Sequence, residues 1–397
     1  MDRLSVFSFT HLLFTSCTTL AQVADPNVAD SVPGVVIAHS PASSGKYIGS
    51  AGLAILHNGT YLAKHDEFGP NSTEHTSAIT RVYRSTDKGE SWQEIAVVDG
   101  LFWSSIFEHH GAVYMIGTHH HHGHLLIYKS IDQGKTWTSP NDRETGLIRP
   151  GKFHTAPVPV LAHDGRLWRA VEDADGPEGW GKMYRPRVMS IPLDGDLLDA
   201  NQWTITNPIE RDGGWLGGDF WCVLEGNVVV DRDRVVRNIL RSNHDDTAAV
   251  TTVSSDGKVQ SIDPDLDRIP LPGSSKKVEI RWDKSSGLYW ALSNLPHASN
   301  NKKPEATARN TLAIFSSPNL RTWTLRSILL HHPDSKYHAF QYPDWLIEGD
   351  DLLVASRTAF DDGCGGAHSA HDANFLTFHR FPNFRRMTMA ADGIQIK

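Results

Sequence analysis

A short motif that occurs twice constrains the fold of this chain more than any other feature. Residues 85–92 (STDKGESW) and residues 130–137 (SIDQGKTW) both follow the pattern S-x-D-x-G-x-[ST]-W. Ser and Asp side chains close a tight turn, Gly adopts a positive φ at low cost, and Trp packs between sheets. A degenerate third copy spans residues 316–323, where Pro318 and Leu320 replace the Asp and the Gly. The motif therefore predicts a repeating β-structure.

The rest of the chain repeats on the scale of a propeller blade. Short β-type runs alternate with Gly, Asp, Asn and Pro turns, and long helical periodicity is missing. A repeat of roughly 50 residues is typical of a β-propeller. Counted directly, the strand-turn-strand units are six, beginning near Leu53, Trp103, Thr155, Trp221, Val278 and Phe340. The segment at residues 35–39 is placed to close the ring with the last unit.

The first residues have the pattern of an export signal. Arg3 is followed by an apolar run over residues 4–14 and by small residues up to Ala21. The run is too short to cross a bilayer and is typical of a cleaved secretory signal. We therefore expect a signal peptide at residues 1–21, a single propeller domain at residues 22–397, and a secreted, extracellular protein.

Neither the net charge nor the hydropathy of the chain indicates a nucleic-acid or membrane partner. The net charge of −8 gives no reason to expect a nucleic-acid partner, and no later stretch is apolar enough to be a membrane helix. We expect neither partner, and a monomer. Signal cleavage would leave Cys222 and Cys364, whose spacing does not decide whether they form a disulfide.

Many polar residues are predicted to meet at one mouth of the propeller. In an up-and-down blade, the loops after the second strands and the entries to the first strands open on one face, and the motif turns lie on the other. The residues at these positions are His65, Asp66, His75, residues 119–122, His154, Arg169, Glu172, Asp173, Arg241, Asn294, Gln341, Tyr342 and Arg357. Such convergence predicts a binding site.

The four consecutive histidines at 119–122 do not by themselves predict a metal site. Adjacent residues on an extended chain point in opposite directions, so four in a row cannot all face one ion. The sequence therefore assigns no metal ligands.

The motif at residues 85–92 and 130–137 resembles the Asp box of sialidase-like propellers. Further segments resemble the sialidase-like family of rhamnosyl-glucuronate lyases and α-L-rhamnosidases that act on rhamnose-capped arabinogalactan. These segments are residues 61–75, 153–159, 165–170, 225–227, 341–342, 356–359 and 371–374. The resemblance spans the mature chain. It implies a seven-bladed, all-β propeller, against the direct count of six, and we expect seven. It also implies no required cofactor, although the lyases are expected to hold a structural calcium ion in some cases.

True sialidases are the nearest competing family. Their hallmark is an Arg-Ile-Pro before the first Asp box, together with an Arg triad and a Tyr–Glu pair. Here Arg268-Ile269-Pro270 occurs after two Asp boxes and is interpreted as a turn. The sequence therefore disfavours hydrolysis of sialic acid.

The expected function is that of a lyase that releases terminal L-rhamnose from α-1,4-linked D-glucuronate in arabinogalactan-type glycans by β-elimination. This reaction needs a base, an acid and a group that offsets the carboxylate charge. We expect His65 and His75 to be the catalytic acid and base. The residues expected to bind the sugar and its carboxylate are His122, His154, Arg169, Arg357 and Tyr342.

Two alternatives remain open. Most glycosidases use two carboxylates, and Asp66, Glu67 and Glu74 lie near the two catalytic histidines in the sequence, so a rhamnosidase-type hydrolase is possible. A glycan-binding propeller without catalysis is the second alternative, because fold alone does not decide function.

Overall fold

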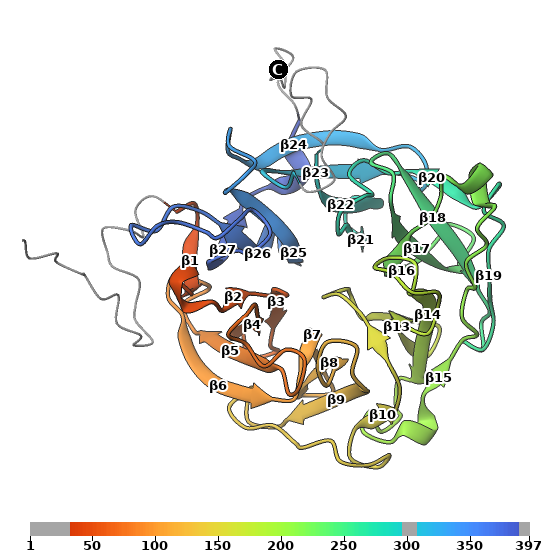
Figure 1. Cartoon of the computed structure of the whole chain (residues 1–397), viewed down its shortest axis with the longest axis horizontal. Helices are drawn as coiled ribbons and strands as arrows, with labels where there is room; N and C mark the ends of the chain where they lie inside the picture. The colour runs from red at the N-terminus through yellow and green to blue at the C-terminus, as the bar shows by residue number, and fades with distance from the viewer. Residues whose placement is uncertain (1–31, 296–307, 389–397) are drawn as a thin grey trace, which may run out of the picture.

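Six antiparallel sheets stand around a central axis in the computed structural model, which describes residues 32–295 and 308–388 (Figure 1). The six blades counted directly from the sequence are confirmed, and the seven blades implied by the resemblance are wrong. The segments between the counted units form long loops, such as residues 174–184 and 360–374, and no seventh sheet occurs among the described residues.

The first three blades follow one another along the chain. The first contains β3 (Gly52–Ile55), β4 (Tyr61–Phe68), β5 (Ile79–Ser85) and β6 (Gln93–Asp99), with β2 (Tyr47–Ile48) beside the end of β4. The second contains β7 (Phe102–His109), β8 (Ala112–Thr118), β9 (Leu125–Ser130) and β10 (Leu147–Arg149). The third contains β12 (Leu161–His163), β13 (Arg166–Asp173), β14 (Arg185–Pro192) and β15 (Thr204–Ile205), with β11 (Phe153–His154) beside the end of β13.

The last three blades complete the ring. The fourth contains β16 (Val223–Val230), β17 (Val236–Ser242), β18 (Thr247–Val253), β19 (Gln260–Ser261) and β20 (Arg268–Pro270). The fifth contains β21 (Glu279–Asp283), β22 (Leu288–Asn294), β23 (Thr311–Ser317) and β24 (Thr324–His331). The sixth contains β25 (Ala339–Glu348), β26 (Asp351–Ala359), β27 (Phe375–Phe381) and β1 (Val35–His39). The short 3-10 helices are η1 (Ala42–Ser44), η2 (Ala200–Gln202), η3 (Trp215–Gly218) and η4 (Phe384–Arg386).

The first strand of the chain closes the ring. β1 pairs antiparallel with β27, with Val35 opposite Phe378 and His39 opposite Phe375. The sixth blade therefore takes three strands from one end of the chain and one from the other, as the sequence predicts for residues 35–39.

The Asp boxes form the turns that the motif predicts. In the first box Ser85 Oγ accepts a hydrogen bond from the Gly89 amide at 2.9 Å, and Asp87 accepts one from the Ser91 amide at 3.0 Å. Trp92 packs against Phe378 of the sixth blade with ring centroids 5.5 Å apart. Trp137 packs in the same way against the core between the first and second blades. Both Trp residues lie between blades as predicted, although each is only half-buried.

The degenerate third copy keeps the turn by other means. Leu320 takes the left-handed conformation, with a φ of 65°, at the position where the other copies have Gly. Asn319 Oδ1 accepts from the amides of Arg321 and Thr322 at 3.0 and 2.9 Å, which replaces the missing Asp. Trp323 Nε1 donates to the Leu320 carbonyl, as the Trp does in the intact boxes.

The two faces of the ring differ as the sequence predicts. The side of the ring on which β4, β8, β13, β17, β22 and β26 end is called the loop face. The antiparallel order of the strands places the Asp boxes on the other side.

Three further expectations concern features outside the blades. Cys222 and Cys364 do not form a disulfide. None of the described helices is long and apolar enough to cross a membrane. The predicted signal peptide at residues 1–21 lies outside the described residues.

Candidate active site at the loop face

Three arginines converge on one tyrosine at the loop face. Arg241 at the end of β17 places Nη1 3.4 Å from the hydroxyl of Tyr342. The guanidinium carbons of Arg309 and Arg357 lie 5.1 and 5.2 Å from the centre of the Tyr342 ring. Residues from three blades therefore build one cationic centre.

The charges of these arginines are unequally compensated. Arg241 pairs with Glu225 at 2.8 Å, whereas Arg309 donates to Gln341 Oε1 at 2.5 Å and Arg357 to the carbonyl of His371. In the described part of the chain, no carboxylate lies within ion-pair distance of Arg309 or Arg357. Burial lowers the pKa of both guanidiniums, that of Arg357 to about 10. Two buried cations thus lack an ion-pair partner in the part of the chain that the structure describes, which is costly unless a ligand supplies one.

Tyr342 and Glu225 form a hydrogen-bonded pair within this centre. The Tyr342 hydroxyl donates to Glu225 Oε1 at 3.0 Å, and Glu225 also accepts from Arg241. Arg241 and the other nearby cations hold the pKa of the Glu225 carboxyl below its usual value, although burial alone would raise it. The carboxylate is therefore ionised and accepts hydrogen bonds from both the phenol and the guanidinium.

β-bulges aim three of the side chains at the site. Trp103, Glu225 and Tyr342 have φ values of 50°, 48° and 47°, in the left-handed region. Each lies where the pairing register shifts in the first strand of its blade, namely β7, β16 and β25. Such conformations are uncommon for non-Gly residues, and bulges that re-aim side chains cluster at functional sites.

A second group of rings lies beside the cationic centre. The ring of His154 lies 4.4 Å from that of Trp103 and stacks on Tyr184 at 4.2 Å. His122 Nε2 lies 3.1 Å from the Tyr184 hydroxyl. Burial lowers the pKa of His122 to about 4 and that of His121 to about 3, with smaller contributions from neighbouring histidines. These two imidazoles are therefore neutral at physiological pH.

His154 has a carboxylate partner that can orient it. Its Nδ1 lies 3.4 Å from Glu172 Oε2, and both side chains are buried. The other oxygen of Glu172 accepts from the amide of Gly226, next to Glu225. A carboxylate that holds one ring nitrogen leaves the other nitrogen available for proton transfer.

The structure does not place His65 where the sequence predicts. β4 continues to Phe68, so His65 lies within a strand and only 3% of it is exposed. Its Nε2 lies 3.1 Å from the Tyr83 hydroxyl, and burial lowers its pKa to about 4. The expectation that His65 lies on an exposed loop is wrong, because the alternation of the strand directs its ring against Tyr83 within the first blade.

The remaining predicted residues divide between the site and the interior. Arg357, Tyr342, His122 and His154 meet at the loop face as described above. His75 is exposed in the loop after β4, with its ring 4.8 Å from that of His121 at the rim. Arg169 is instead 1% exposed and donates to Ser105 Oγ and to the carbonyls of Ala156 and Ala170, so it links the second and third blades.

Several residues of the site were not predicted from the sequence. Glu225, Arg309, Trp103 and Tyr184 are absent from the predicted set. Glu225 carries a signal, because it directly precedes Gly226 in a strand, and Gly within a strand often marks a bulge. Arg309 has none, since it follows a long polar segment without periodicity.

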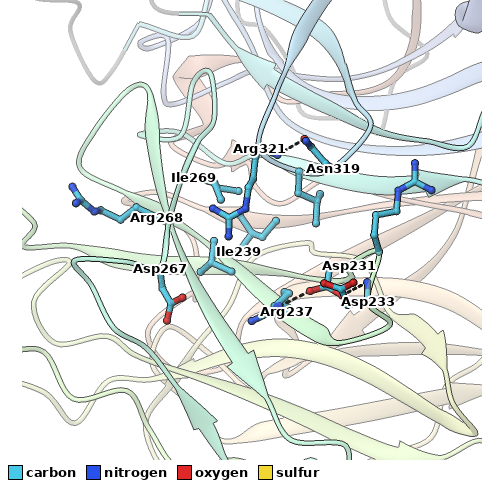
Figure 2. Close-up of a pocket in the computed structure, with 12 residues that line it drawn as sticks. Asp231, Asp233, Arg237, Ile239, Asp267, Arg268, Ile269, Asn319 and Arg321 are labelled. Carbon is cyan, nitrogen blue, oxygen red and sulfur yellow. Dashed lines mark hydrogen bonds and ion pairs between the residues drawn. The ribbon is translucent and has the colours of Figure 1, made fainter.

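A cavity of about 260 Å³ lies elsewhere, between the fourth and fifth blades on the Asp-box face (Figure 2). Three of its charged residues are held by other parts of the chain: Arg237 pairs with Asp231 at 2.8 Å, and Arg232 donates to the carbonyls of Pro318 and Gly287. Arg268 of the Arg-Ile-Pro segment also lines it, in β20 rather than in a turn. None of the predicted site residues borders this cavity.

The calcium ion implied by the resemblance does not fit the cluster of possible metal ligands in the described chain. That cluster is His332, Asp334 and His338. Calcium takes six to eight oxygen ligands, whereas this set offers two nitrogens and one carboxylate.

Fold and site together define a six-bladed Asp-box propeller with a cationic centre on its loop face. The profile of the BNR repeat-like domain family matches residues 101–354, and the chain belongs to this family. No curated protein sequence gives a significant match.

Similar solved structures share the fold at low identity. An α-L-arabinanase from Penicillium chrysogenum, solved with arabinobiose, is 15% identical with a TM-score of 0.53, over 90% of this chain and 99% of that one. An α-L-arabinofuranosidase from Fusarium graminearum, solved with an iminosugar inhibitor, is 13% identical with a TM-score of 0.55, over 89% and 98%. Trypanosoma rangeli sialidase, solved with sialic acid, is 14% identical with a TM-score of 0.53, over 84% and 54%. At these identities the likeness establishes the fold alone.

Proposed function

We propose that this protein is a secreted lyase that binds an acidic sugar at the cationic centre and releases terminal L-rhamnose from α-1,4-linked D-glucuronate. The observation that carries the proposal is the pair of buried guanidiniums, Arg309 and Arg357, without a carboxylate partner in the described chain. Arg binds carboxylates through two parallel hydrogen bonds, so a uronate carboxylate is the ligand that this centre fits best.

The side chains around the centre suit β-elimination. With its carboxylate charge offset by Arg309 and Arg357, the uronate has a more acidic C5 proton. His154, oriented by Glu172, removes this proton, and the C–H electrons form the C4–C5 double bond. The C4–O bond breaks, and the Tyr342 hydroxyl protonates the departing rhamnose oxygen. His75 and His122 lie at the rim and contact the sugar. His65 has no role in this scheme because its ring packs against Tyr83.

Hydrolysis is a second candidate, and one specific observation favours it. Tyr342 is hydrogen-bonded to Glu225 at 3.0 Å, and three arginines surround the pair. This group contains the same residue types as the Arg triad and Tyr–Glu pair of sialidases, although none of the arginines comes from the Arg-Ile-Pro segment. In that case Glu225 activates the Tyr342 hydroxyl as a nucleophile towards the anomeric carbon of an acidic sugar.

Product analysis on a rhamnose-capped glucuronate oligosaccharide tests the proposal. We expect free rhamnose together with an unsaturated uronate that absorbs ultraviolet light. A saturated uronate would instead indicate hydrolysis. The matched control is the same oligosaccharide with its carboxyl group reduced to an alcohol, which should not be cleaved. Equal cleavage of both substrates would show that the arginines do not bind a carboxylate.

Kinetics of two variants test the assigned roles. Arg357→Ala should raise KM more than it lowers kcat, because its contact with the carboxylate exists in ground and transition states alike. His154→Gln should lower kcat about 100-fold, the usual size for a lost general base. His110→Ala, on the Asp-box face, is the control. Native turnover in His154→Gln would assign the base to another residue.

A further inference from the structure

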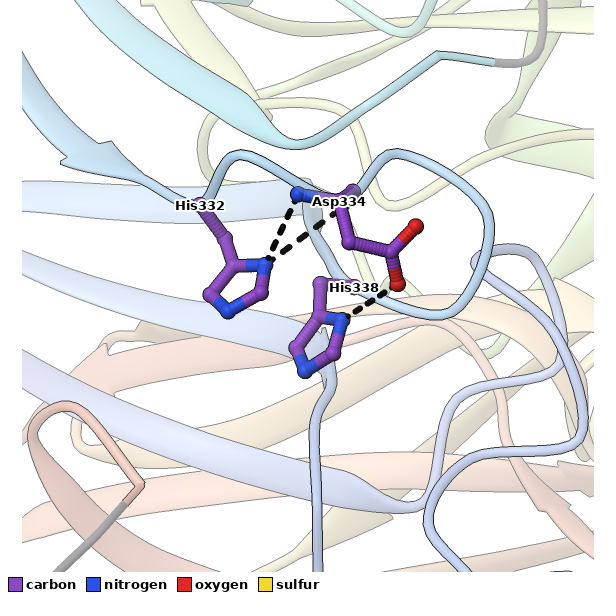
Figure 3. Close-up of side chains that lie close together, drawn as sticks. All are labelled: His332, Asp334 and His338. Carbon is purple, nitrogen blue, oxygen red and sulfur yellow. Dashed lines mark hydrogen bonds and ion pairs between the residues drawn. The ribbon is translucent and has the colours of Figure 1, made fainter.

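A compact group of nitrogen and oxygen donors lies in the loop between β24 and β25 (Figure 3). The rings of His332 and His338 stack with centroids 3.5 Å apart at an angle of 16°. Nδ1 of His338 lies 2.8 Å from Asp334 Oδ2, and Nδ1 of His332 accepts from the Asp334 amide at 3.1 Å. Both Nδ1 atoms therefore face Asp334, and one donor atom from each residue lies within 4.8 Å of the others.

We propose that His332, Asp334 and His338 bind a divalent first-row transition-metal ion of the zinc class. Two imidazoles and one carboxylate form a three-ligand set that such ions accept, with the fourth position left to water. The donor atoms lie within 4.8 Å of one another, so small movements of the side chains bring all three to the bond lengths of roughly 2.0–2.2 Å that one ion requires. Magnesium and calcium, which require oxygen ligands, do not fit.

The surroundings of His338 support this assignment. His338 is 5% exposed, and its Nε2 lies 3.5 Å from Asp361 Oδ2, close enough for an ion pair but without a hydrogen bond. Histidines that bind a metal through one nitrogen commonly donate the other N–H to a carboxylate. Asp361 is placed to accept from Nε2 once Nδ1 binds the ion.

The position of this loop gives the ion a structural role. The loop leads directly into β25, which carries Gln341 and Tyr342. The ion would therefore fix the entry of the strand that supplies the central tyrosine.

Metal titration of the full chain tests the proposal. Chelator-treated protein titrated with ZnCl₂ in a calorimeter should bind one ion per chain, and Zn²⁺ should raise the thermal unfolding midpoint. His332→Ala and His338→Ala should abolish this binding. Asp361→Asn should weaken it about 10-fold, as expected for a partner that orients a ligand. If an alanine variant does not fold, Asp334→Asn, which keeps the size of the side chain, replaces it as the variant that removes a ligand.

Two controls separate this group from other histidines. His109 and His110 are also neighbours, with rings 4.0 Å apart, but both bond to the Leu193 carbonyl; the double alanine variant should keep the site. His119→Ala/His120→Ala should keep it too. Undiminished zinc binding in folded His338→Ala, loss of binding in either control, or absence of binding by the native chain would overturn the proposal.

Discussion

At the scale of single residues, buried charge decides what the site can bind. Arg241 has its own carboxylate in Glu225, so it adds little net charge to the centre. Among the described residues, Arg309 and Arg357 donate hydrogen bonds to neutral oxygens, those of Gln341 and of the His371 carbonyl, and form no ion pair. An anion that binds between them would supply the negative charge that these two guanidiniums lack among the described residues.

His65 offers a test of the difference between a buried and a catalytic histidine. His65→Ala removes a ring that packs on Tyr83, and we expect the free energy of unfolding to fall by about 2 kcal/mol. We expect kcat of the folded variant to stay close to the native value. The exposed His75→Ala is the matched control and should change stability by less than about 0.5 kcal/mol. Urea unfolding and kinetics on both variants check this; a large loss of kcat in stable His65→Ala would return His65 to the chemistry.

Part of the site can be predicted from the sequence for a physical reason. Tyr342, Arg357 and His154 were predicted because strand order alone fixes the face on which their positions open. The sequence predicts that the second strand ends at Lys64, because the residues after it are polar. In the structure β4 continues through these polar residues to Phe68, so His65 lies within the strand. Arg309 could not be predicted because the path of its loop depends on tertiary contacts, and for Glu225 the following Gly226 indicates a bulge but not its contact with Tyr342.

At the scale of elements, the bulges in the first strands have a steric requirement. A Cβ atom on Gly226 would lie 2.2 Å from Asn238 Oδ1 of the neighbouring strand β17. The bulge that turns Glu225 towards Tyr342 therefore requires Gly at the next position.

Gly226→Ala tests this requirement. The substitution should displace Asn238 and shift Glu225, with a cost of about 1–3 kcal/mol for overpacking and a clear loss of kcat. Gly213→Ala is the matched control, because a Cβ there meets no atom within 4 Å and the backbone is not left-handed. Chemical unfolding and steady-state kinetics check the prediction, and equal behaviour of the two variants would contradict it.

At the scale of the whole molecule, buried histidines should set the response to acid. Burial lowers the pKa of His65 and of His379 to about 4, below the value near 6.5 in the unfolded chain. The unfolded chain therefore binds more protons between these values, and stability falls as the pH decreases through this window. Asp344 acts in the opposite direction, because burial raises its pKa to about 7.

The histidines should outweigh this single aspartate. The pKa values of His121, His122 and His371 are lowered as well, so more groups favour loss of stability in acid than oppose it. We expect the midpoint of urea unfolding to be lower at pH 5 than at pH 7.5. A midpoint that rises towards pH 5 would show that Asp344 dominates.

The number of blades shows what the sequence could and could not predict for the whole ring. The six units were visible because each has its own turns and apolar strands, and strand pairing is largely local. The expectation of seven blades rests on the family resemblance. Such a resemblance predicts the fold class more reliably than it predicts the number of blades.

The pairing of β1 with β27 has a consequence for the order in which the protein is made. β1 leaves the ribosome first, yet its partner β27 begins more than 300 residues later. Until synthesis is nearly complete, β1 has an unpaired edge, and five blades can form while the ring stays open. Closing so long a span is slow compared with local pairing, so the last step of maturation belongs to the finished chain. A chain whose synthesis stops before residue 375 would lack β27. The unpaired edge of β1 would then be free to pair with strands of other nascent chains.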